Sequence, residues 1–254
     1  MGGASFGRPR PFPGTVGGVD VLALIHGDNV RAGVFGDVVE ERGHTLEEWS
    51  LAWDKPLPRP LDDYGGVLVF GGAMHADQDD HHPWLRDENM FLQRLLTQRI
   101  PVLGVCLGAQ LLAKAALAPV FPAPEPEIGW ADVELTEAAA DDPLFSRLPR
   151  RFESFQWHYY TYEVPAGAAE LARSRVCTQA FRLGESAWAI QFHAEVTLQQ
   201  VESWIDEGDG GRELPVPREE LQAQTHERIG AWNDLGRAIC GGFLEAAERV
   251  AAPA

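Results

Sequence analysis

The clearest indication of the fold class is the segment Pro101-Val102-Leu103-Gly104-Val105-Cys106-Leu107-Gly108. Its first half is almost wholly apolar, which predicts a short strand buried on both faces. Strong helix formers follow over residues 107–117, so the strand is expected to turn directly into a helix. A buried strand next to a helix is the repeating unit of α/β proteins.

The same unit occurs upstream. Apolar runs at residues 19–25 and 66–70 predict buried strands, and helical spacing of apolar residues follows at residues 34–39 and 84–96. A further strand is expected at residues 46–53. Strands that alternate with helices in this way predict a doubly wound, largely parallel sheet with helices on both faces.

The second half of the chain has a different pattern. Residues 127–192 predict strands and turns with little helix, and residues 188–192 form the last buried strand. Thr197 then fits a helix N-cap. Apolar residues at helical spacing predict a C-terminal helical arm at about residues 218–250 that packs on the domain. We expect one domain over residues 19–254, preceded by a flexible Gly- and Pro-rich tail at residues 1–18.

Composition excludes several classes of partner. Asp and Glu total 38 against 21 Lys and Arg, which gives a formal net charge of −17. A surface of this charge repels the phosphates of nucleic acids and anionic lipids, so neither nucleic acid nor membrane is an expected partner. No apolar run approaches the length of a membrane span. Three widely spaced cysteines make no disulfide framework, and we expect a cytoplasmic protein.

Cys106 occupies the junction between the predicted strand and the predicted helix. This is the setting of a nucleophile elbow, in which small neighbours, here Gly104 and Gly108, allow a sharp turn. The helix N-terminus behind Cys106 favours the reactive thiolate. The Leu107 N–H and the Gly71-Gly72 turn could supply the backbone donors for an oxyanion. A buried cysteine can equally be an inert small hydrophobic residue.

His193-Ala194-Glu195 directly follows the last predicted buried strand. An imidazole can take the proton of a cysteine and return it to a leaving amine near neutral pH. Glu195 lies two residues on, so in extended backbone its carboxylate lies on the same side and can orient the imidazole. A histidine at the end of a strand can also be purely structural. Together with Cys106, the motif predicts a Cys–His–Glu triad.

Five motifs in order now establish a resemblance over about residues 19–204. They are Val69-Phe70-Gly71-Gly72, Gly104-Val105-Cys106-Leu107-Gly108-Ala109-Gln110, Glu127-Ile128-Gly129-Trp130, Gln156-Trp157-His158 and Gln191-Phe192-His193-Ala194-Glu195. With them the chain resembles the class I, triad-type glutamine amidotransferases, close to stand-alone GMP-synthase-like amidotransferase domains. The resemblance implies a flavodoxin-like α/β fold.

The resemblance also implies an activity. Cys106 would attack the side-chain amide of glutamine, release ammonia and form a glutamyl thioester, with His193 moving protons and Glu195 supporting it. Gly72 and Leu107 match the oxyanion-hole positions, and Gln110 matches a residue of the glutamine pocket. We further expect Gly71 and His158 next to the substrate.

Other features are expected to be structural. His75-Ala76-Asp77-Gln78-Asp79-Asp80-His81-His82 has the composition of a metal site, but it follows the Gly71-Gly72 turn and precedes Pro83. A solvated loop beside the active site is therefore the preferred interpretation, because metal sites usually draw ligands from more than one element. We expect no metal and no cofactor.

Three alternatives stay open at this point. The same triad could hydrolyse another γ-glutamyl amide, because it attacks any amide that the pocket admits. The chain could be a regulatory subunit, or it could need a partner for activity. No phosphate-binding loop of the GxxxxGK[ST] kind occurs, so the ammonia acceptor would belong to a separate synthetase chain, or ammonia would be a free product.

Overall fold

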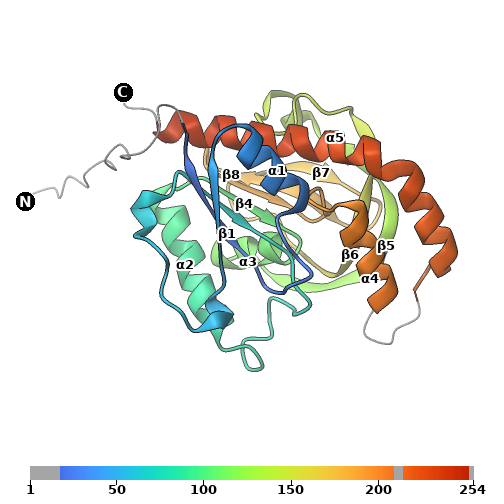
Figure 1. Cartoon of the computed structure of the whole chain (residues 1–254), viewed down its shortest axis with the longest axis horizontal. Helices are drawn as coiled ribbons and strands as arrows, with labels where there is room; N and C mark the ends of the chain where they lie inside the picture. Colours follow the sequence, from blue (N-terminus) through green and yellow to red (C-terminus); the bar gives the residue numbers. More distant parts are fainter. Residues whose placement is uncertain (1–17, 209–213, 252–254) are drawn as a thin grey trace, which may run out of the picture.

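A mixed β-sheet runs through the middle of the molecule (Figure 1). The computed structural model describes residues 18–208 and 214–251, so the tail expected at residues 1–18 lies outside the described residues except for Gly18. Within the described part, nine strands pair in the order β2-β1-β3-β4-β9-β8-β7-β5-β6. Their bounds are β1 Asp20–Leu24, β2 Thr45–Trp49, β3 Gly66–Val69, β4 Val102–Val105, β5 Val120–Leu135, β6 Arg151–Tyr162, β7 Ala168–Arg173, β8 Thr178–Leu183 and β9 Ala187–Ile190.

The sheet has a parallel and an antiparallel part. Strands β2, β1, β3, β4 and β9 run parallel, as the alternation of strands and helices predicts. The strands β8, β7, β5 and β6 extend it through antiparallel pairs. This extension corresponds to the strand-and-turn region expected downstream of residue 127, where turns replace the crossover helices that parallel strands need. The predicted α/β fold with a C-terminal helix is confirmed.

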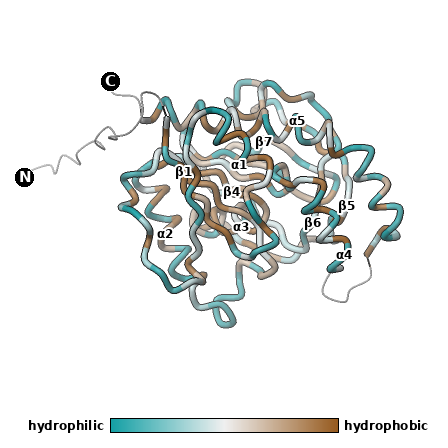
Figure 2. Tube along the Cα trace, in the orientation of Figure 1, coloured by the Kyte–Doolittle hydropathy of each residue, from teal (hydrophilic) through white to brown (hydrophobic). Residues whose placement is uncertain are grey.

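Helices cover both faces of the sheet. On one face lie α1 (Gly33–Glu41), α4 (Leu198–Glu207) and α5 (Arg218–Ala251), and on the other lie α2 (Trp84–Gln98) and α3 (Leu107–Ala115). In strand β1, successive side chains alternate between the two faces of the sheet. Val21 and Ala23 pack under α1 and α5, whereas Leu22 and Leu24 belong to the core under α2 and α3. Figure 2 shows these central strands as the most hydrophobic part of the chain.

Several predicted boundaries are wrong: β5 begins at Val120, before the expected residue 127, and β9 ends at Ile190, before the expected residue 192. Two further errors have a local cause. The strand expected at residues 46–53 ends at Trp49, because Ser50 caps a 3₁₀ turn at Leu51–Trp53 by accepting a hydrogen bond from the Ala52 N–H at 3.3 Å. The helix expected to reach Leu117 ends at Ala115. Leu117 instead has a left-handed φ of 65° and is 86% exposed.

The C-terminal arm is a continuous helix, α5, of 34 residues. It runs across the top of the molecule in Figure 1 and packs against α1, α4 and the edge of the sheet. Before it, Thr197 caps α4 as predicted and forms a reciprocal capping box with Gln200. Despite the length of α5, no helix in the described ranges is both long and apolar enough to cross a membrane.

Candidate active site

Three of the five sequence motifs meet at the carboxyl ends of the parallel strands. Strands β3, β4 and β9 are parallel neighbours, so their carboxyl ends lie side by side. The Gly71-Gly72 turn follows β3, Cys106 follows β4, and His193 follows β9. Open α/β sheets place their ligands at this edge, because the loops there leave a crevice between the layers.

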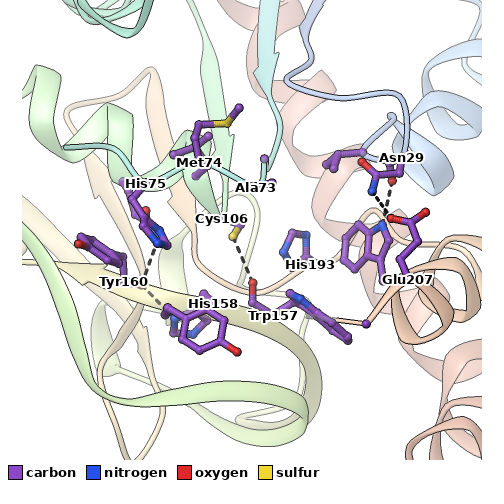
Figure 3. Close-up of a pocket in the computed structure, with 17 residues that line it drawn as sticks. Asn29, Ala73, Met74, His75, Cys106, Trp157, His158, Tyr160, His193 and Glu207 are labelled. Atoms are coloured by element: carbon purple, nitrogen blue, oxygen red, sulfur yellow. Dashed lines mark hydrogen bonds between the residues drawn. The ribbon is translucent and has the colours of Figure 1, made fainter. Parts of the chain in front are cut away.

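Cys106 sits on a strained turn between β4 and α3. Its φ of 53° and ψ of −106° lie outside the ordinary regions for a residue with a side chain, which costs on the order of 1–3 kcal/mol. The turn is possible because two close approaches need glycine. A Cβ on Gly108 would lie 2.1 Å from the Val69 carbonyl oxygen, and one on Gly104 would lie 2.5 Å from that of Gly108. The Cys106 thiol donates to the Trp157 carbonyl oxygen at 3.8 Å (Figure 3).

His193 and Glu195 form a buried pair. The His193 Nδ1 lies 2.7 Å from the Glu195 Oε1, and both side chains are almost fully enclosed. Burial alone would lower the pKa of His193, but the Glu195 carboxylate, followed by Cys106, outweighs it and raises the pKa to about 10. The imidazole is thereby held as a cation that can stabilise a neighbouring thiolate.

Distant helices fix the backbone of this motif. The Trp232 Nε1 on α5 donates to the His193 carbonyl oxygen at 2.8 Å, and the Val34 N–H at the start of α1 donates to that of Glu195 at 2.8 Å. The Trp204 ring on α4 packs edge-on to the imidazole with centroids 4.8 Å apart. Sequence reasoning assigned neither tryptophan to a motif, since each lies in a segment that it predicted only as a helix. The signal it overlooked is that a buried indole N–H needs an acceptor.

A pocket of about 390 Å³ opens above Cys106 and His193 (Figure 3). Six predicted site residues line it, from four different segments of the chain: Gly72, Cys106, Leu107, Gln110, His158 and His193. Glu195 supports His193 from behind. Gly71 also lies behind the wall, where an added Cβ would come within 3.0 Å of the His193 Cε1 and 3.6 Å of the Cys106 Cβ.

Gln110 and His158 face the pocket but bond to the protein. The Gln110 Nε2 donates to the Tyr160 carbonyl oxygen at 3.0 Å and to the Gln191 Oε1 at 3.3 Å. The His158 Nδ1 donates to the same Tyr160 oxygen at 3.0 Å, and its Nε2 lies 3.2 Å from the Glu127 Oε2. These contacts give both side chains a fixed position in the wall.

Glu127, the first residue of the third sequence motif, is the centre of a buried polar network. Among the described residues, Glu127, His158 and Cys177 form the one group whose metal-binding atoms lie within 4.8 Å of one another. The Glu127 Oε2 also accepts from the Gln179 Nε2 at 2.8 Å and the Ser174 Oγ at 3.0 Å. Burial raises the pKa of Cys177 to about 12, so its thiol keeps its proton. The group fits a hydrogen-bonded network better than a metal site.

The acidic and histidine-rich loop at residues 75–82 lies beside the pocket, as expected. Its polar groups contact the protein and do not converge on one point. The Lys114 Nζ pairs with the Asp79 Oδ1 at 2.7 Å, and the Tyr160 hydroxyl donates to the Asp77 Oδ2 at 3.2 Å. His75 stacks on the Tyr160 ring with centroids 4.2 Å apart.

Asn29 and Glu207 line the pocket although neither belongs to the sequence motifs. Asn29 follows β1 and Glu207 ends α4, and the Asn29 Nδ2 donates to the Glu207 Oε2 at 2.8 Å (Figure 3). Glu207 is exposed at the pocket mouth. Its carboxylate is suited to a substrate that carries an ammonium group. No local pattern joins positions 178 residues apart, so sequence reasoning could not find this pair.

The geometry as a whole suits acyl transfer. A thiol on an elbow, a cationic imidazole and a buried carboxylate occur in the order that a nucleophile, its proton carrier and the orienting group require. The N-terminus of α3, which is the positive end of the helix dipole, faces the same pocket.

Comparison with known proteins agrees with this geometry. The family described as glutamine amidotransferase class-I matches residues 37–206 of this chain. YfeJ of Salmonella typhimurium, described as glutamine amidotransferase-like, is 29% identical over 215 residues, covering 83% of this chain and 89% of YfeJ. A gamma-glutamyl-L-1-hydroxyisopropylamide hydrolase of a Pseudomonas species is 29% identical over 147 residues, covering 54% of this chain and 49% of the hydrolase.

A solved structure extends the match over most of the chain. The crystal structure of a glutamine amidotransferase from Thermotoga maritima superposes with a TM-score of 0.80 at 29% identity, covering 89% of this chain and 98% of that one. The family match spans well over half of the chain and includes Cys106, His193 and Glu195. The chain therefore belongs to the class I glutamine amidotransferase family.

Proposed function

We propose that this chain hydrolyses the side-chain amide of glutamine to glutamate and ammonia through a thioester on Cys106. One observation carries the proposal. Cys106 lies on a strained elbow in a pocket of about 390 Å³, beside His193, whose Nδ1 is bonded to Glu195 at 2.7 Å. Family membership supports glutamine as the substrate.

The first half-reaction would form the thioester. The Cys106 thiol passes its proton to His193, the resulting thiolate attacks the amide carbon, and the carbonyl oxygen takes the negative charge of the tetrahedral intermediate. His193, held as the imidazolium by Glu195, then donates its proton to the amide nitrogen. The carbon–nitrogen bond breaks, ammonia leaves, and glutamyl stays on the sulfur.

The second half-reaction would hydrolyse the thioester and regenerate the free enzyme. His193, now neutral, takes a proton from water as the water oxygen attacks the thioester carbon. The carbon–sulfur bond breaks, glutamate leaves and Cys106 departs as the thiolate, stabilised again by the imidazolium.

Backbone donors would stabilise both tetrahedral intermediates. Gly72 and Leu107 both line the pocket next to Cys106. The Leu107 N–H belongs to the first turn of α3, where backbone N–H groups have no partner within the helix. We propose these two N–H groups as the oxyanion hole, where loss of one donor costs on the order of 10²–10³ in rate.

Release of ammonia and glutamate from glutamine by the purified chain tests the proposal. Cys106→Ala should lower kcat at least about a thousand-fold, as loss of a nucleophile does in other triads. Cys240→Ala is the matched control, because Cys240 is also buried but does not line the pocket, and its thiol donates to the Phe35 carbonyl oxygen of α1. Normal turnover by Cys106→Ala would rule out the mechanism. Turnover that begins only when a second chain is added would indicate a partner-dependent subunit.

A second candidate is hydrolysis of a γ-glutamyl amide with a larger leaving group. At about 390 Å³ the pocket falls in the range of about 300–1,000 Å³ that holds drug-sized ligands, so it has room beyond glutamine itself. The similarity to the Pseudomonas γ-glutamyl amide hydrolase supports this reading. A panel of γ-glutamyl amides compared by kcat/KM separates the two. A higher kcat/KM for an N-alkyl amide than for glutamine would favour the second candidate.

A further inference from the structure

A second buried ion pair lies directly behind the Gly71-Gly72 turn. His26 follows β1, and Glu88 is on α2; their side chains are 2% and 0% exposed. The His26 Nε2 lies 3.0 Å from both carboxylate oxygens of Glu88. Trp84 stacks on the imidazole with centroids 5.7 Å apart and closes the pair from the α2 side. The triad does not use either residue.

The other imidazole nitrogen holds two backbone carbonyls. The His26 Nδ1 lies 3.1 Å from the Phe70 carbonyl oxygen and 3.0 Å from that of Gly71. Carbonyl oxygens only accept hydrogen bonds, so Nδ1 carries a proton. Burial would lower the pKa of His26, but the Glu88 carboxylate and the two carbonyls outweigh it and raise the pKa. The ring is thus held as an imidazolium with both N–H groups engaged.

Fixing the Gly71 oxygen also fixes the Gly72 N–H, because both belong to one planar peptide group. This peptide is trans, so its C=O and N–H point in opposite directions. With the oxygen held by His26 behind the turn, the Gly72 N–H is directed to the opposite side, where Gly72 lines the pocket. A peptide between two glycines rotates more easily than any other, so an external restraint matters here.

We propose that His26 and Glu88 are positioning residues for the oxyanion hole: they lock the Gly71-Gly72 peptide with its N–H towards the substrate and never touch the substrate themselves. This inference rests on the proposed function. It also implies that the hole is assembled within this chain before substrate binds. Donors fixed in advance lower the barrier most, because no reorganisation is needed during the reaction.

Glu88→Gln tests the inference, because it removes the charge that holds His26 and keeps the shape. We expect kcat for glutamine to fall tenfold or more, and KM to change less than twofold, since only the transition state carries the oxyanion. Alkylation of Cys106 by iodoacetamide should change less than twofold. That reaction displaces iodide at a saturated carbon and forms no oxyanion, so it reports on the thiolate alone. Asp142→Asn is the matched control, a fully buried carboxylate bonded to the Leu144 N–H.

Two substitutions at His26 give an independent readout. The amide nitrogen of asparagine is bonded to Cγ, as Nδ1 is in histidine, so His26→Asn keeps a donor near the Gly71 oxygen. His26→Leu keeps none. We expect His26→Asn to retain at least fivefold more kcat than His26→Leu, with similar KM values.

The outcomes separate the alternatives. Unchanged kcat in Glu88→Gln with a lowered Tm would show a purely structural pair and overturn the inference. An equal loss of kcat and of alkylation rate would place the effect on Cys106 and also overturn it. Equal kcat values for the two His26 variants would do the same. Failure of the wild-type chain to hydrolyse glutamine or any γ-glutamyl amide would instead contradict the proposed function, and this inference with it.

Discussion

The indole N–H of Trp232 donates to the carbonyl oxygen of His193 at 2.8 Å. The C-terminal helix α5 therefore contacts the backbone of the residue that we propose as the proton carrier. Two further residues of α5 contact the segment that follows His193. Gly236, one helical turn after Trp232, packs against the Ala194 carbonyl oxygen, and the Asn233 Nδ2 donates to the Val196 carbonyl oxygen at 2.8 Å. The helical arm is thus part of the site as well as part of the core.

Trp232→Phe should lower both stability and activity. It leaves the buried His193 carbonyl oxygen without its donor, at a cost of about 1–3 kcal/mol in the free energy of unfolding. Loosening of His193 should also reduce kcat by about threefold or more. Denaturant unfolding and glutamine turnover measure the two effects.

Trp188→Phe is the control for this prediction. Trp188 is equally buried, and its Nε1 donates to the Asp142 Oδ2 at 3.2 Å, away from the pocket. We expect a similar loss of stability with kcat unchanged. Equal losses of kcat in both variants would show that activity follows general stability and not the contact with His193.

Gly236→Ala and Gly230→Ala should have opposite effects on stability, although both are on α5. A Cβ at Gly236 would lie 2.1 Å from the Ala194 carbonyl oxygen, so the helix must shift, at a cost of about 1–3 kcal/mol. A Cβ at Gly230 has nothing within 4 Å, and alanine there should stabilise the helix by about 0.5–1 kcal/mol. Thermal melts with turnover assays check both. Destabilisation by both variants would contradict this packing.

Glu195→Gln should shift the alkaline limb of the pH profile of kcat/KM to lower pH. In the wild type, the pKa of His193 is raised to about 10, so the imidazolium persists below that pH and is lost as pH rises through it. We expect kcat/KM to fall above about pH 10. Removal of the carboxylate charge lowers the pKa of His193, so the limb should shift to lower pH. Glu153→Gln, at an exposed ion pair with Arg228, is the control and should leave the limb in place.

Glu207→Gln should weaken binding without slowing chemistry. Glu207 lies at the pocket mouth, and we propose that its carboxylate pairs with the α-ammonium group of the substrate. Because the site is exposed to solvent, we expect KM to rise only about two- to fivefold with kcat unchanged. Glu202→Gln, on the same helix but paired with His226 at 2.9 Å, should leave KM unchanged. A fall in kcat for Glu207→Gln would contradict a role in binding alone.

Several features of this protein could be predicted because they depend only on residues that are close along the chain. An apolar run, two glycines and a following helix were enough to predict the turn at Cys106. The spacing of His193 and Glu195 predicted that their side chains lie on the same side, and the structure has the His193 Nδ1 2.7 Å from the Glu195 Oε1. Thr197 was recognisable as an N-cap because a cap bonds to a backbone N–H three residues away. Each of these follows from local geometry, which residue types and spacing encode directly.

The distant residues that support the site could not be predicted, because their contacts form only when the layers pack. Trp232 lies 39 residues from His193, Glu88 lies 62 residues from His26, and Glu207 lies 178 residues from Asn29. Nothing local marks these pairs, because each depends on where two helices or loops cross once the layers have packed. Packing between layers is a property of the whole chain, and a single sequence does not display it.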